Sequence, residues 1–138
     1  MNSVVFLEKL AQDYGSLKDQ FSRSFTSLSL TEDFVKAKAI FIKPNLTYPT
    51  YKEGVTTRKE FIECLVAVLR QINATTKIYI GEGEGGYNSF SMTNALEDMG
   101  FYELEKEFPQ VKVINLSKIP SREDFSVEIN RFVASIFY

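Results

Sequence analysis

Residues 39–46 have the sequence Ala-Ile-Phe-Ile-Lys-Pro-Asn-Leu. The fold predicted for the neighbouring segments depends on this stretch. The apolar run at its start predicts a buried strand over 39–43. Pro44 lacks a backbone donor and therefore forces the chain out of the sheet. A polar loop follows and lasts until a helix begins after Thr57. A strand, a polar loop and a helix start are a common ligand-holding unit of α/β proteins.

The helix after this loop is predicted to run to about Ile72. Thr57 and Glu60 have the spacing of a capping box, which predicts Thr57 as the N-cap. The apolar residues of the segment cover more than one narrow stripe of a helix. We therefore expect this helix to be buried by a second element in addition to the sheet. Cys64 lies among these apolar residues and is expected to be an inert core thiol.

Two more strands are predicted, over Lys77–Gly81 and Val111–Leu116. A helix from about Ser91 to Met99 lies between them, with Gly100 as its C-cap, and residues 101–108 favour another helical turn or two. The alternation of strands and helices predicts an α/β fold with a mostly parallel sheet of about four strands. We expect helices on both faces, in a three-layer, Rossmann-like arrangement.

The two ends of the chain allow more than one interpretation. Val4–Leu7 is predicted as the first strand and Ser16–Leu28 as a helix capped by Ser16, while a single helix from Val4 to Phe25 is the alternative. Residues 29–38 are predicted to be a polar connection. In the tail, residues 129–136 fit a helical face and residues 125–129 fit a strand. The chain is apolar to its last residue, so we expect residues 1–138 to form one α/β domain that is either a fragment or a module whose edge is covered by something absent.

Composition excludes several classes of function. A net charge of −2 with mixed signs does not favour a nucleic-acid partner, and no segment has the roughly 20 apolar residues of a membrane helix. The single cysteine and the lack of a basic, apolar leader predict a cytoplasmic protein. With no histidine and one cysteine, we expect neither zinc nor an iron–sulfur cluster within this chain. Any metal would be a hard cation such as Mg²⁺.

Polar residues follow the predicted strands where parallel strands share one edge of the sheet. Lys43 and Glu82 are the candidate catalytic residues, and Glu82 is also the candidate metal ligand. The candidate ligand-binding residues are Asn45, Thr56, Thr57, Glu84 and Ser89. Each of these candidates also has a structural alternative, as a solvent-exposed charge, a turn residue or a helix cap.

Residues 81–86 match the pattern G-x-G-x-x-G after a strand. Glu82 and Glu84 lie inside this loop and would repel a pyrophosphate. The following strand ends in Asn115 rather than in an acid that could bind a ribose. The segment is therefore not interpreted as a dinucleotide site.

The segments Ile40–Leu46, Gly54–Thr57 and Ile78–Glu82 together resemble the N-terminal part of the DUF362 family, a prokaryotic domain of unknown function. The resemblance implies a strand ending in Lys-Pro-Asn, a Thr-Thr helix start and a strand ending in Gly-Glu. It also implies that the family's later strands, and a downstream segment with Lys and His, are not in this chain. Some family members are fused to ferredoxin-like iron–sulfur domains, whose cysteines are not found here.

Two functions follow as hypotheses. The first is an uncharacterised DUF362-like domain that binds a small anionic molecule, with or without Mg²⁺, at the carboxyl edge of the sheet. Lysine, threonine hydroxyls and a helix start suit an anion. The alternative is a non-catalytic or truncated module that completes its core as a homodimer or with a missing C-terminal domain.

Overall fold

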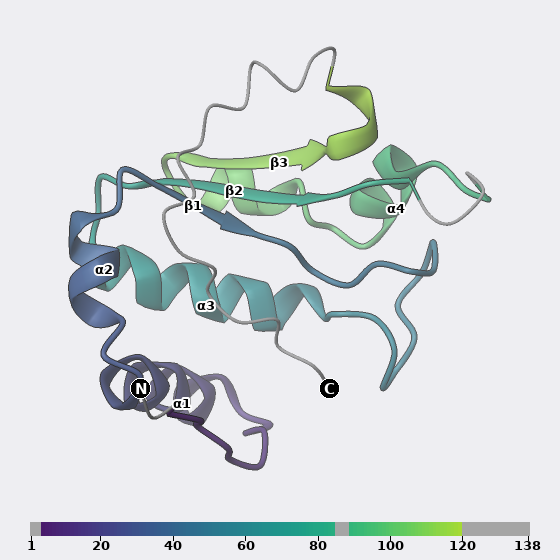
Figure 1. Cartoon of the computed structure of the whole chain (residues 1–138). Coiled ribbons are helices and arrows are strands. Elements are labelled where there is room, and N and C mark those ends of the chain that lie inside the picture. Colours follow the sequence, from purple (N-terminus) through teal and green to yellow (C-terminus); the bar gives the residue numbers. More distant parts are fainter. Residues whose placement is uncertain (1–3, 85–88, 120–138) are drawn as a thin grey trace.

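The structure is a computed structural model that describes residues 4–84 and 89–119 (Figure 1). These residues form a three-stranded parallel sheet in the order β1-β2-β3, combined with helices. An α/β fold with a parallel sheet is therefore confirmed. The elements are α1 (Tyr14–Ser27), α2 (Thr31–Lys36), β1 (Ala39–Ile42), α3 (Lys59–Ile72), β2 (Lys77–Glu82), α4 (Met92–Asp98), α5 (Glu103–Glu107), β3 (Val111–Asn115) and the 3-10 turn η2 (Leu116–Lys118).

The sheet has one deeply buried face. Ile78 and Ile80 of β2 are fully buried, and Val111 and Val113, their partners in β3, share that face. Most of the residues that alternate with them are half-buried or exposed, Tyr79 and Lys112 among them, and Gly81 is the buried exception. Side chains alternate between the faces of a strand, so the sheet has one core face and one less buried face.

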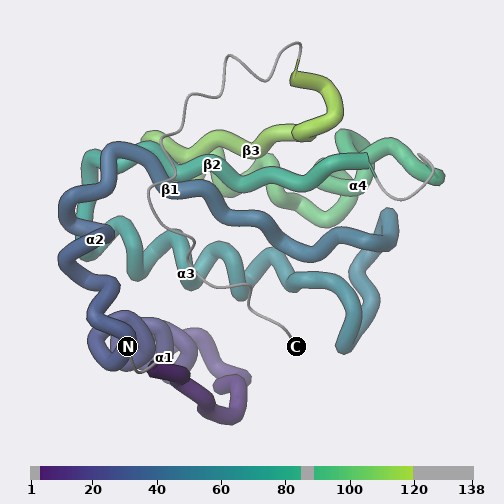
Figure 2. Tube along the Cα trace, viewed as in Figure 1, coloured from purple at the N-terminus to yellow at the C-terminus, as the bar shows by residue number. Residues whose placement is uncertain are grey.

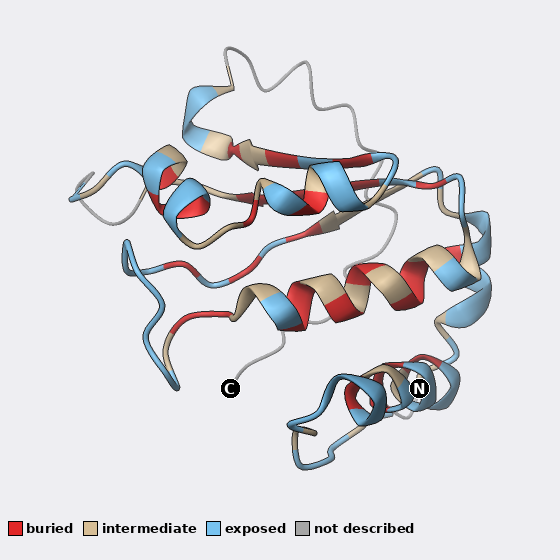
Figure 3. Ribbon diagram, turned by 180° about the vertical axis from the view of Figure 1, so that it is seen from behind, coloured by how far each residue is buried: buried red, intermediate tan, exposed pale blue. Residues whose placement is uncertain are grey.

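The helices that connect the strands lie on this core face. The ammonium of Lys59 in α3 lies 3.0 Å from a carboxylate oxygen of Glu103 in α5, so the two helices are neighbours. Figure 3 shows α4 and α5 in front of the sheet when it is seen from behind. Two right-handed crossovers that advance in one direction, β1 to β2 to β3, place both connections on one face. The described helices thus differ from the expected placement on both faces.

Helix α3 is covered on its other side by α1. The rings of Phe21 in α1 and Phe61 in α3 have centroids 5.0 Å apart, and the buried Cys64 thiol lies 3.7 Å from the carbonyl oxygen of Tyr14. Figure 2 shows α1 beyond α3, on the side away from the sheet. The prediction that α3 packs under more than the sheet is confirmed. The layers are sheet, α3 and then α1.

The predicted strand Val4–Leu7 is wrong. This segment forms no regular element, and Val5 and Leu7 are 82% and 94% exposed. The chain after it is held to α1 by Gln20, whose side chain donates to the Lys9 carbonyl and accepts from the Ala11 amide. The β-branched pattern predicts an extended backbone, but a strand also needs a neighbour to pair with.

The helix predicted over Ser16–Leu28 is confirmed with a shifted start, because α1 begins at Tyr14. Its cap is Asp13 rather than Ser16: the Asp13 carboxylate accepts from the Ser16 amide at 2.9 Å. Gly15 lies in the first turn of α1. Residues 4–13 are not helical, so the alternative of a single helix from Val4 to Phe25 is wrong. The hydrogen bonds from Ser16 hold the pKa of Asp13 below its ordinary value.

The segment predicted as a polar connection contains the short helix α2. Asn73, just after α3, fixes the end of α2 because its side-chain amide donates to the carbonyls of Phe34, Val35 and Ala37. The Thr76 hydroxyl also donates to the Ala37 carbonyl, at 2.7 Å. These hydrogen bonds join the end of α2 to the connection between α3 and β2.

The elements after β2 agree with those predicted from the sequence. The Ser91 hydroxyl accepts from the Asn94 amide as the N-cap of α4. Gly100 has a φ of +74° just after that helix, a conformation that favours glycine. Strand β3 is confirmed over Val111–Asn115. The helix or strand predicted between residues 125 and 136 lies outside the described residues.

None of the helices in the described ranges 4–84 and 89–119 is long and apolar enough to cross a membrane.

Candidate functional site

Strands β1 and β2 end side by side at the carboxyl edge of the sheet, where Lys43 and Glu82 form an ion pair. The Lys43 ammonium lies 2.5 Å from Glu82 Oε2. Glu82 Oε1 accepts a hydrogen bond from the Gly83 amide. The Lys43 side chain is 56% exposed, whereas that of Glu82 is 14% exposed. The sequence argument from shared strand ends thus brings together the two residues proposed for chemistry.

Asn45 and Thr57 close the base of the polar loop. The Asn45 amide donates to Thr57 Oγ1, and the Thr57 amide donates to the Asn45 carbonyl, both at 2.9 Å. The Asn45 side chain donates to the Val55 carbonyl. The Thr56 hydroxyl accepts from the Lys52 amide and donates to the Lys52 carbonyl. The polar groups of these residues therefore hold the loop in shape.

The capping box predicted at Thr57 is wrong. Arg58 is the N-cap of α3, and no side chain makes a capping hydrogen bond there. The oxygen that Thr57 would need for capping accepts from Asn45 instead. A tertiary contact across the loop has replaced the local one.

Glu84 lies in a different environment from Glu82. Its Oε2 accepts from the Met92 amide at the start of α4, and its Oε1 accepts from the buried side chain of Asn115 at the end of β3. These hydrogen bonds, that of Asn115 first, hold the pKa of Glu84 below its ordinary value. The Asn115 amide group also donates to Thr93 Oγ1. Glu84 therefore joins β2 to α4 and β3.

The predicted residues thus fall into separate groups. Lys43 meets Glu82, Asn45 meets Thr57, and Glu84 belongs to a cluster with Asn115. Ser89 is exposed and has no hydrogen bond within the described residues. Reasoning from sequence missed the role of Asn115, although its place at the end of a strand is a signal that a polar side chain faces the carboxyl edge.

The residues fit Mg²⁺ poorly. Among the described residues no group of three or more acidic or thiol side chains could hold a metal. Glu82, the candidate ligand, already has Lys43 on one oxygen and the Gly83 amide on the other. A cation would have to displace the lysine from Glu82.

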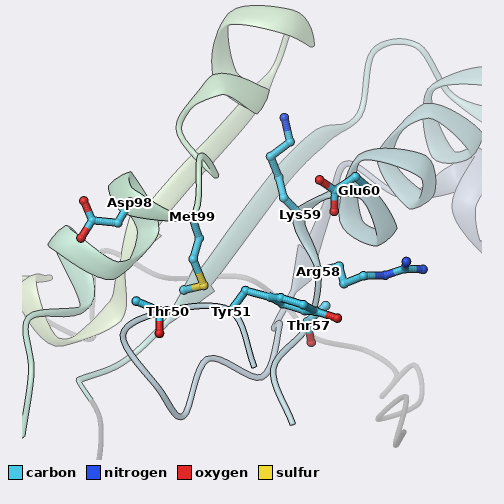
Figure 4. A pocket seen from close by; sticks show the side chains of 8 residues that line it. All are labelled: Thr50, Tyr51, Thr57, Arg58, Lys59, Glu60, Asp98 and Met99. Carbon is cyan, nitrogen blue, oxygen red and sulfur yellow. The ribbon is translucent and has the colours of Figure 1, made fainter. Parts of the chain in front are cut away.

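A shallow depression of about 380 Å³ lies at the start of α3, where the loop from β1 arrives (Figure 4). Thr57 is the one predicted site residue that lines it. Tyr51 from the loop and Met99 after α4 line it too. The sequence analysis did not single out these two residues, because nothing in the local pattern shows that the loop folds toward α4.

Fold and site define a class of α/β protein in which the polar loops that follow parallel strands gather at the carboxyl edge. A family model described as Domain of unknown function (DUF362) matches residues 40–136. The match covers more than half of the chain, which therefore belongs to this family, as the resemblance implied. Searches of curated proteins and of solved structures gave no match.

Proposed function

We propose that this DUF362 domain binds a small anionic molecule at the carboxyl edge of its sheet, with Lys43 as the main source of positive charge. The observation that carries this proposal is the Lys43–Glu82 ion pair, in which an exposed ammonium rests on a mostly covered carboxylate. Ligands of parallel α/β sheets bind beyond the carboxyl ends of the strands. Lys43 lies at such an end and is accessible.

An anion need not break the ion pair. An ammonium has three hydrogen-bond donors, and Glu82 Oε2 occupies one of them. The other two can be offered to a carboxylate or phosphate. Glu82 limits the freedom of the lysine before the ligand arrives, which reduces the entropy lost on binding. If the ligand draws Lys43 away, the Glu82 carboxylate is left free to accept a proton from the ligand.

Asn45, Thr56 and Thr57 act in this proposal by holding the loop after Lys43. Their hydrogen bonds fix where the chain leaves β1 and where it enters α3. Glu84 and Ser89 extend the polar surface toward β3. We place the domain in the cytoplasm, because its one cysteine is buried and has no second cysteine in the chain.

The test is a thermal-shift screen against carboxylated and phosphorylated metabolites, followed by variants. A true ligand raises the melting temperature of the wild type, and Lys43→Ala removes most of that shift. Glu82→Gln alters the shift without abolishing it, because the lysine remains. Lys36→Ala is the matched control: Lys36 also pairs with a glutamate, at 3.3 Å, on the exposed surface of α2. A shift that survives in Lys43→Ala contradicts the proposal.

A second candidate function has its own observation. Val4, Val5 and Leu7 are apolar and 67% to 94% exposed, and exposed apolar surface often marks an interaction site. We propose as the alternative a module that completes its core with a second copy or with a C-terminal domain. Light scattering after size exclusion decides: a monomer at high concentration whose elution is unchanged by Val5→Ser and Leu7→Ser counts against it.

A further inference from the structure

The depression at the start of α3 is a second feature of the carboxyl edge, and Lys43 and Arg58 flank the loop that forms part of its wall. The reciprocal hydrogen bonds between Asn45 and Thr57 bring the two ends of this loop together. Lys43 is two residues before Asn45, and Arg58 directly follows Thr57. Each cation is therefore close in the chain to one of the two residues that close the loop. The lining residues are Thr50, Tyr51, Thr57, Arg58, Lys59, Glu60, Asp98 and Met99.

The depression offers an apolar surface on which a ring can stack. Tyr51 is 49% exposed although it lines the depression. In Figure 4 its side chain extends across the view, with Met99 toward one end and Arg58 and Thr57 toward its hydroxyl end. Aromatic rings attract other rings in offset or edge-on arrangements, and a thioether also packs well against a ring.

Arg58 and Lys59 are the cations that line the depression, beside the carboxylates of Glu60 and Asp98, and in Figure 4 the Arg58 guanidinium extends away from the Tyr51 ring, beyond its hydroxyl end. Lys59 is engaged by Glu63 at 3.5 Å and by Glu103 at 3.0 Å, and its ammonium points away from Tyr51 in Figure 4. Arg58 makes no ion pair with any described residue. A guanidinium binds a carboxylate or phosphate through two parallel hydrogen bonds.

We infer that this depression holds the planar ring of an anionic ligand, a small aromatic carboxylate or phosphate ester, with the ring against Tyr51 and Met99 and the charge near Arg58. The inference rests on the proposed function, because it names the ligand class of that same edge. A volume of about 380 Å³ is near the lower end of the range for small-molecule sites. It suits one ring with few substituents.

The experiment compares ring-bearing with ringless anions by amide NMR titration of the whole chain. Benzoate and phenyl phosphate are the ring-bearing probes, and acetate and inorganic phosphate are their ringless partners. We expect the ring-bearing probes to bind at about 1 mM and to shift the amides of Tyr51, Thr57 and Met99. The ringless probes are expected to bind about fivefold more weakly, the size of one stacking contact.

Three variants isolate the ring contact. Tyr51→Ala is expected to remove the fivefold preference, and Tyr51→Phe to retain it. Tyr48→Ala is the matched control, because Tyr48 is an exposed tyrosine of the same loop that does not line the depression and packs on Lys52. The inference is overturned if Tyr51→Ala keeps the preference, or if the shifted amides lie elsewhere.

Lys43→Ala separates this inference from the proposed function. If all four anions bind through Lys43 with no preference for a ring, the proposed function stands and the ring site fails. If the ring-bearing probes depend on Tyr51 and are unaffected by Lys43→Ala, the ring site stands and the role of Lys43 fails.

Discussion

Glu82 and Glu84 are two residues apart at the end of β2, and their surroundings differ. Glu82 pairs with one exposed lysine through one oxygen and accepts from the amide of the next residue, Gly83, through the other. Glu84 accepts from a backbone amide and from the buried Asn115. A carboxylate whose partners are fixed holds elements together, whereas one whose partner is an exposed side chain can exchange that partner for a ligand. The difference separates a structural acid from a candidate functional one in the same loop.

The largest expected effect is on the structural side, from Asn115→Ala. Asn115 is 8% exposed and hydrogen-bonds Glu84, Thr93 and the Ser117 amide. Removing it leaves partly buried groups without partners, so the free energy of unfolding should fall by about 2 kcal/mol. Urea denaturation followed by far-UV circular dichroism measures this. A loss no larger than that of Lys43→Ala would erase the contrast between the two clusters.

The next effect depends on pH and arises from Glu84. Its pKa is lowered in the folded state, so its carboxylate stabilises the protein above the ordinary pKa of 4.5, and this contribution is lost as pH falls through the folded pKa. The wild type should therefore lose stability on acidification by more than Glu84→Gln does. Urea midpoints at pH 7 and about pH 3 give the comparison, with the exposed loop residue in Glu53→Gln as the control. If the urea midpoint falls by the same amount between the two pH values in Glu84→Gln and in Glu53→Gln, the assignment to Glu84 is contradicted.

A smaller effect is expected in the loop between Lys43 and Arg58. Thr57→Val keeps the shape of the side chain but removes the acceptor for the Asn45 amide, at a cost of about 1 kcal/mol. Thr47→Val, at an exposed position of the same loop, should cost nothing measurable. Thermal unfolding compares the two, and equal melting temperatures would show that the Asn45–Thr57 closure does not hold the loop.

The smallest effect on stability is expected from Lys43. The Glu82 carboxylate is mostly covered, but the Lys43 side chain is 56% exposed and solvent screens the pair, and ion pairs with such exposure contribute roughly 0 to 1 kcal/mol. A double-mutant cycle with Lys43→Met and Glu82→Gln should give a coupling energy in this range and vanish in high salt. A coupling well above it would mark the pair as a structural element and weaken its candidacy as a binding site.

Much of this molecule can be predicted from periodicity and strand order. The wide apolar surface of residues 59–72 predicted a helix covered on two sides, and the Lys43–Glu82 contact followed from the edge that parallel strands share. Errors arose where a residue had a choice of partner. Thr57 has the chemistry of a cap, yet its oxygen accepts from Asn45 across the loop. The Val4–Leu7 segment pairs with no strand among the described residues, and no local pattern reveals whether such a neighbour exists.

The Cys64 thiol gives this fold a built-in reporter of its own opening. It is fully buried between α1 and α3, and burial raises its pKa to about 11, so a thiol reagent can react only after α1 has separated from α3. Because the chain has one cysteine, its labelling rate at neutral pH counts the openings of that single interface. Measured with and without an anion, that rate would show whether binding at the carboxyl edge of the sheet changes how often α1 separates from α3.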